Sequence, residues 1–176
     1  MTRLYCGDEL SIRNQRVPKR TRKLPDLGEN EYRQGALERI RDAETLMRRE
    51  QYAGAIYMAG RAVEGMLRGL IWKSDTDVRR AKTSLDTGHD LRELVTRISN
   101  LGLLRADGHD DDFVASVQRI ARLWFNNMRF ASSRFVETRW WKLKEVRRKR
   151  TFKEASSDYF NACSAVVRRC EALWQR

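Results

Sequence analysis

The chain has 176 residues and a formal net charge of +12, with 36 Lys or Arg residues against 24 Asp or Glu residues. A hydrophobic fraction of 41% and only two prolines exclude a wholly disordered chain, and the length suits one domain with additional segments. No window of about 18 uncharged apolar residues exists, and the first residues lack the apolar core of a secretory signal. We therefore expect no membrane-spanning helix and a cytoplasmic location.

The positive charge is concentrated in two segments. Residues 1–28 carry a net charge of +4 and form a basic N-terminal arm whose composition is typical of disorder. Residues 134–150 carry a net charge of +6 in a basic aromatic segment, whereas the other 131 residues together carry only +2. We therefore expect residues 29–176 to form a single helical domain that includes the basic aromatic segment.

Apolar residues at helical spacing predict five helices, and strand-like alternation is nearly absent. Helices joined by connections of moderate length indicate an all-α fold, an antiparallel up-and-down bundle of four or five helices. For residues 131–150 the pattern leaves open whether a short helix forms. Thr151 and Glu154 have the spacing of a capping box and predict the start of the last helix. The predicted helices span residues 30–50, 52–73, 90–100, 110–130 and 151–174.

The second predicted helix is the most apolar of the five and is expected to be the central one. Each glycine in a helix costs about 1 kcal/mol relative to alanine, so its glycines indicate that a neighbouring helix packs closely against it. Two charged residues, Arg61 and Glu64, flank its apolar face. They are either exposed on its polar side or paired in a pocket between protomers. The glycines are Gly54, Gly60, Gly65 and Gly69.

The three cysteines do not indicate a disulfide framework. Cys163 and Cys170 are seven residues apart on a predicted helix, which separates them by about 10 Å and places them beyond disulfide reach. We expect them to be thiols of the core. Only two histidines occur and no metal-binding spacing is present, so we expect neither a metal site nor a cofactor.

Three segments of the chain resemble the HEPN superfamily (higher eukaryotes and prokaryotes nucleotide-binding domains). They are residues 55–71 of the second predicted helix, residues 88–94 (GHDLREL) and residues 127–130 (NMRF), and their order and spacing cover residues 30–175. The resemblance implies an up-and-down four-helix bundle, commonly a homodimer, in prokaryotic toxin–antitoxin or anti-phage defence modules. It also implies a nucleotidyltransferase as a possible partner. We expect His89, within residues 88–94, to form a structural hydrogen bond.

Many HEPN members are metal-independent ribonucleases with an Arg-x(4–6)-His motif, in which the Arg holds the scissile phosphate and the His moves a proton. In this sequence no Arg is followed by His at that spacing, and Arg105 precedes His109 by one residue too few. A ribonuclease would therefore need a non-standard active site. On a continuous helix, residues 122, 126 and 129 would share one face. The candidates for such a site are Arg122, Asn126, Arg129 and His109.

The basic aromatic segment alternates cations with aromatic residues. Cations bind phosphates and aromatic faces stack on unpaired bases, so the segment indicates binding of RNA or single-stranded DNA. The alternatives are solvated cations beside buried tryptophans, or docking on an acidic protein. The leading prediction is a non-catalytic nucleic-acid-binding module in which Trp140 and Trp141 are stacking platforms. The cationic candidates are Arg134, Arg139, Lys142, Lys144, Arg147, Arg148, Lys149 and Arg150.

Overall fold

The computed structural model describes residues 27–80, 85, 88–104, 110–149 and 151–175. Every regular element in these ranges is a helix, so the all-α prediction is confirmed. Most of the predicted N-terminal arm, with His109 and Arg150, lies outside the described residues. None of the helices combines the length and the apolar character that crossing a membrane requires. The elements are α1 (Glu29–Arg48), α2 (Tyr52–Ser74), α3 (Thr76–Arg79), α4 (Leu91–Asn100), α5 (Asp110–Leu123), η1 (Asn126–Phe130), α6 (Ser133–Trp141), α7 (Lys144–Arg147) and α8 (Phe152–Trp174).

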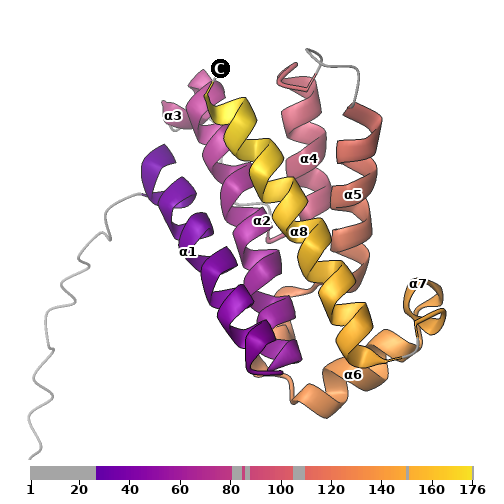
Figure 1. The fold of residues 1–176 in the computed structure, drawn as a ribbon. Coiled ribbons are helices and arrows are strands. Elements are labelled where there is room, and N and C mark those ends of the chain that lie inside the picture. The colour runs from indigo at the N-terminus through magenta and orange to yellow at the C-terminus, as the bar shows by residue number, and fades with distance from the viewer. Residues whose placement is uncertain (1–26, 81–84, 86–87, 105–109, 150, 176) are drawn as a thin grey trace, which may run out of the picture.

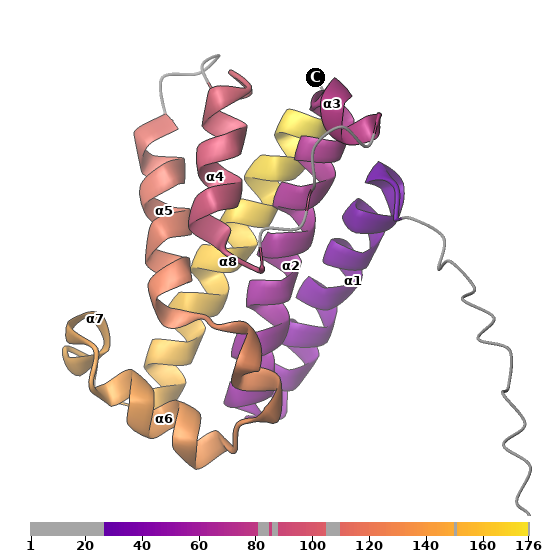
Figure 2. The ribbon, with the colours of Figure 1, turned by 180° about the vertical axis from the view of Figure 1, so that it is seen from behind.

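Five longer helices, α1, α2, α4, α5 and α8, lie side by side and form the helical body (Figure 1). Helix α2 packs against α1, α4 and α8, while α5 packs against α4 and α8. The short helices α6 and α7 lie at one end of the helical body, as the view from behind also shows (Figure 2). We call residues 126–149, which contain η1, α6 and α7, the crossing segment.

Helix α2 is the central element, since α1, α4 and α8 all pack against it. Its neighbours approach it closely at two glycines, Gly60 and Gly65. A Cβ atom at Gly65 would lie 3.1 Å from the Cβ of Ala36 on α1. At Gly60 a Cβ would lie only 2.2 Å from the indole ring of Trp124. That indole also donates its N–H to the carbonyl oxygen of Tyr57, at 3.2 Å. The prediction that a neighbouring helix packs closely is confirmed at Gly65, whereas at Gly60 the close neighbour is the Trp124 ring, just after the end of α5.

Helix α8 begins where the sequence predicts it. The Thr151 Oγ1 accepts a hydrogen bond from the backbone N–H of Glu154 at 3.1 Å, which satisfies a donor in the first turn. Cys163 and Cys170 on this helix are fully buried, and the loss of solvation raises the pKa of both thiols well above the usual range. The prediction that they are core thiols is confirmed.

The predicted helix over residues 110–130 is wrong beyond Leu123, where α5 ends. Phe125 has extended backbone angles (φ −149°, ψ 142°), and the chain then forms the 3-10 helix η1. Apolar residues continue at helical spacing through the break, since Trp124 and Met128 are four residues apart and both are buried. Hydrophobic periodicity therefore could not reveal where the helix stops.

Residues 131–150, left open by the sequence, contain the two short helices α6 and α7. Ser132 caps α6, since its Oγ accepts from the backbone N–H of Phe135 at 3.2 Å. The buried side chains of α6 are Val136 and Trp140, one turn apart. The helix therefore turns one face to the helical body and the other to solvent.

We predict that Gly60→Ala destabilises the protein by about 1–3 kcal/mol, because the new methyl group would overlap the Trp124 ring. The control is Gly35→Ala on α1, where a Cβ would meet nothing within 4 Å. This substitution should stabilise the protein by about 0.5–1 kcal/mol, since alanine favours the helix. Urea unfolding of both variants checks this, and equal shifts of the two midpoints would contradict the packing described.

Candidate nucleic-acid interface

Trp140 is fully buried rather than available for stacking. Its ring lies edge-on to Tyr159 and Phe152, with centroid distances of 5.3 and 5.7 Å. Its indole N–H donates to the carbonyl oxygen of Leu123 at 3.1 Å. The prediction that Trp140 is a stacking platform is therefore wrong, because this side chain anchors α6 to the helical body.

Trp141 is half-buried, and its indole N–H lies 3.4 Å from Oε1 of Glu137 one turn earlier. Part of the ring remains accessible to solvent. A stacking role for Trp141 stays a prediction.

The exposed aromatic residues of the crossing segment are phenylalanines. Phe130 is 77% exposed and Phe135 is 54% exposed, and the other exposed large hydrophobic residue of the described ranges is Leu27. The Arg129 guanidinium lies 4.6 Å from the centroid of the Phe130 ring, a cation–π contact. Exposed aromatic side chains cost solvation free energy, and these two lie on a segment rich in exposed cations, so we consider the crossing segment a candidate contact surface. Val136 and Trp140 form the buried face of α6, so the helical period leaves Phe135 exposed. The exposure of Phe135 could be predicted from the sequence only if the start of α6 were known.

Most cations of the crossing segment point to solvent. One exception is Lys149, which is partly buried and forms an ion pair with Asp158 of α8. Arg139 is exposed and its guanidinium lies 4.4 Å from the centroid of the Phe125 ring. Arg150 lies outside the described residues. The exposed cations are Arg129, Arg134, Arg139, Lys142, Lys144, Arg147 and Arg148.

A hollow of about 510 Å³ lies where α5 meets α7 and the first turn of α8. Three of its cations, Arg119, Lys144 and Arg148, make no ion pair with any residue that the structure describes. The hollow is therefore a cationic surface that could accept phosphate groups. Its lining residues are Arg119, Lys144, Glu145, Arg148, Lys149 and Glu154.

The candidates for a ribonuclease site are separated by the break after α5. Arg122 lies in the last turn of α5, with its guanidinium 3.6 Å from Oε1 of Glu145. Asn126 begins η1, so the predicted helical face shared by residues 122, 126 and 129 is wrong. The Oδ1 atom of Asn126 is buried without a hydrogen-bond partner among the described residues, and Asn126 lines a separate hollow that His89 also lines. The fourth candidate, His109, lies outside the described residues.

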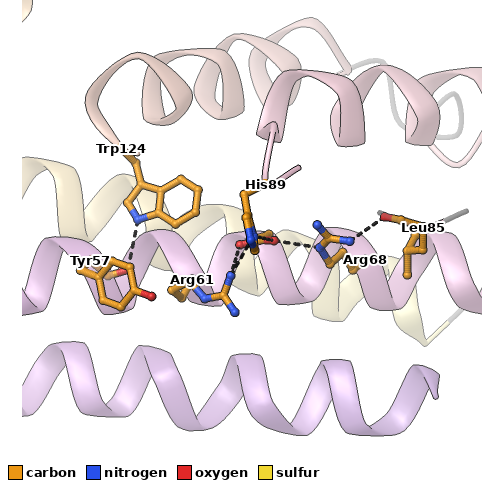
Figure 3. A network of polar contacts seen from close by, with 7 residues as sticks. Tyr57, Arg61, Arg68, Leu85, His89 and Trp124 are labelled. Atoms are coloured by element: carbon orange, nitrogen blue, oxygen red, sulfur yellow. Dashed lines mark hydrogen bonds and ion pairs between the residues drawn. The ribbon is translucent and has the colours of Figure 1, made fainter. Parts of the chain in front are cut away.

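Helix α2 carries a buried network of charged side chains that the sequence analysis did not predict. Glu64 is only 2% exposed, and its carboxylate accepts hydrogen bonds from Arg61 at 2.5 Å and from Arg68 at 2.8 Å. Arg68 also donates to the carbonyl oxygen of Leu85 at 2.6 Å (Figure 3). The expectation that Glu64 is exposed or paired between protomers is wrong, since its partners belong to its own chain. The spacing of residues 61, 64 and 68 along one helix face was the available signal.

His89 completes this network from the connection before α4. Its Nδ1 lies 2.7 Å from Oε1 of Glu64, and because a carboxylate only accepts, Nδ1 carries the proton and donates. His89 has a positive φ of 71° and follows Gly88, whose φ is 59°. The expected structural hydrogen bond of His89 is confirmed. Asp90 then caps α4, accepting from the backbone N–H of Arg92 at 2.8 Å.

We predict that Glu64→Ala destabilises the protein by about 3 kcal/mol, because it leaves the largely buried Arg68 without its counter-charge. The matched control is Glu44→Ala on α1, which removes an exposed pair with Arg48 and should change stability by less than about 0.5 kcal/mol. Thermal or urea unfolding distinguishes the two. A loss at Glu64 no larger than the loss at Glu44 would show that the network does not stabilise the fold.

No group of three or more His, Cys, Asp or Glu residues in the described ranges is arranged to hold a metal ion. Comparison with known proteins gave no significant match to a protein-family model, to a curated protein or to a solved structure.

Proposed function

We propose that the chain is a non-catalytic, HEPN-like module that binds single-stranded nucleic acid, RNA or DNA, through its crossing segment. The observation that carries the proposal is the exposure of Phe130 and Phe135 among cations that point to solvent. Cations alone would suit any polyanion. Exposed aromatic faces beside them match a polyanion whose bases are unpaired.

The cations supply the electrostatic part of binding. Arg119, Lys144 and Arg148 line the hollow between α5, α7 and α8 without ion pairs of their own among the described residues. A phosphate that enters this hollow would therefore gain contacts with cations that form no ion pair with another described residue. Each neutralised phosphate releases counterions, so affinity should fall as the salt concentration rises.

The phenylalanines supply the preference for single strands. Stacking on an aromatic side chain contributes about 1–3 kcal/mol per base, and a base inside a duplex cannot reach such a ring. The Arg129 guanidinium covers part of Phe130 and leaves 77% of the residue exposed.

The wider HEPN-like setting is part of the same proposal. The three segments that resemble the superfamily fall on α2, on the connection into α4 and on η1, and the helices of the body lie side by side. These features support an antiparallel up-and-down bundle. A homodimer, a nucleotidyltransferase partner and a role in prokaryotic defence or in a toxin–antitoxin system follow from the resemblance.

Fluorescence anisotropy with a labelled single-stranded RNA and the matching duplex tests this proposal. Replacing Arg119, Lys144 and Arg148 by alanine should weaken binding of both probes and reduce the single-strand salt slope by about 2, since each lost phosphate contact contributes about 0.7. Replacing Phe130 and Phe135 by alanine should weaken single-strand binding about tenfold or more and leave duplex binding unchanged.

The matched control replaces three exposed cations of α1, Arg41, Arg48 and Arg49, by alanine. This variant has the same net charge as the Arg119, Lys144 and Arg148 variant. If both triple variants weaken binding equally, the chain attracts nucleic acid only through its overall charge and the proposed interface is wrong. Cleavage of the RNA by the wild-type protein would contradict the non-catalytic role.

A further inference from the structure

A second hollow lies away from the crossing segment, between α1, α2 and the connection before α4. Its volume is about 530 Å³, within the range of small-molecule sites. On the α1 side, Gly35 leaves open space, since a Cβ there would meet nothing within 4 Å. The side chains that matter for its chemistry are Tyr32, Arg39, Arg61, Arg68, Leu85 and His89.

Arg61 is the cation of this groove with donors to spare. Its NH1 atom donates to Glu64, whereas its Nε and NH2 atoms make no hydrogen bond with the described residues. The side chain is 36% exposed and lies on the part of α2 that faces α1 (Figure 3). Arg39 lines the opposite wall from α1 and is half-exposed in a pair with Asp42 at 3.2 Å. Two guanidinium groups therefore reach the groove from facing helices.

His89 offers a third polar atom. Glu64 holds Nδ1 at 2.7 Å, which fixes the ring and leaves Nε2 without a hydrogen bond to any described residue. Nε2 accepts in the neutral ring and donates in the imidazolium form. The ring lies beside Arg61, whose NH1 is 3.1 Å from Nδ1. The backbone around it is held at positive φ, and such conformations collect at ligand-binding sites.

The charges of the groove favour an anion. Three arginines, Arg39, Arg61 and Arg68, line it together with two carboxylates, Glu31 and Glu64, and Arg39 is paired with Asp42. The negative charge of Glu64 is shared by two arginines, Arg61 and Arg68, so this cluster of three side chains keeps one excess positive charge. A phosphate group carries several acceptor oxygens on different sides, which suits donors that converge from α1, from α2 and from the imidazolium form of His89.

We propose that this groove binds the phosphate group of a small molecule, with Arg61 donating to the phosphate oxygens and Nε2 of the His89 imidazolium as a second donor. Arg39 adds positive charge from the α1 side. The half-buried Tyr32 and the side chain of Leu85 bound the part of the groove that would accept the remainder of the ligand. The site is independent of the proposed nucleic-acid interface, since no residue lines both hollows.

Titration of the ¹⁵N-labelled protein with inorganic phosphate, followed by the imidazole resonances of His89, tests this inference. The chain has two histidines, so a His109→Gln variant assigns the signals. We expect a saturable shift of the Nε2 resonance that sodium chloride at equal ionic strength does not produce. Arg61→Ala should weaken phosphate binding about tenfold, and Arg61→Lys, which keeps the charge and loses the planar fork, should weaken it less.

The matched control is Arg41→Ala, an exposed cation of α1 that does not line the groove. Its phosphate affinity should equal that of the wild-type protein. A shift that chloride reproduces, a titration without saturation, or equal losses in the Arg41→Ala and Arg61→Ala variants would each overturn the site. The variants that replace Phe130 and Phe135 by alanine should bind phosphate with the affinity of the wild-type protein. Loss of RNA binding in these variants and loss of phosphate binding in the Arg61→Ala variant therefore test the two proposals separately.

Discussion

The contact between Gly60 and Trp124 is the constraint on which the rest of the structure depends. Without a side chain at Gly60, the indole ring fits directly against the backbone of α2 and donates to the carbonyl of Tyr57. The chain leaves α5 at this point, becomes extended at Phe125 and runs across the end of the helical body. The position of every proposed nucleic-acid contact in the crossing segment follows from this turn.

A second anchor, Trp140, determines which face of α6 meets solvent. Its burial against α8 turns Val136 inward and leaves Phe135 and the cations outside. The aromatic residues that the proposed function requires are therefore the smaller phenylalanines, because the tryptophan with the larger apolar surface is used by the core. The basic aromatic segment therefore contains both a core residue, Trp140, and an exposed candidate contact, Phe135. Only the packing of α6 shows which residue has which role.

Sequence reasoning succeeded where local rules decide the outcome. The glycines of α2 indicated close packing, Thr151 marked the start of α8, and Cys163 and Cys170 were expected in the core. It failed where tertiary contacts decide. The apolar spacing of a helix continues past the break after Leu123, and the contact between Glu64 and His89 joins residues far apart in the chain. Neither the break nor the contact with His89 has a local signature, whereas the spacing of residues 61, 64 and 68 is a local signal for the rest of the network.

The central claim is that bases stack on the exposed phenylalanines of the crossing segment. Photo-crosslinking of the wild-type protein to a single-stranded RNA with 4-thiouridine, followed by tryptic digestion and mass spectrometry, tests it most directly. Arg129, Arg134 and Arg139 flank Phe130 and Phe135, so trypsin separates the two rings into different peptides. The account predicts crosslinks in residues 130–134 and 135–139. Crosslinks confined to α1 or α4, with none in these two peptides, would contradict it.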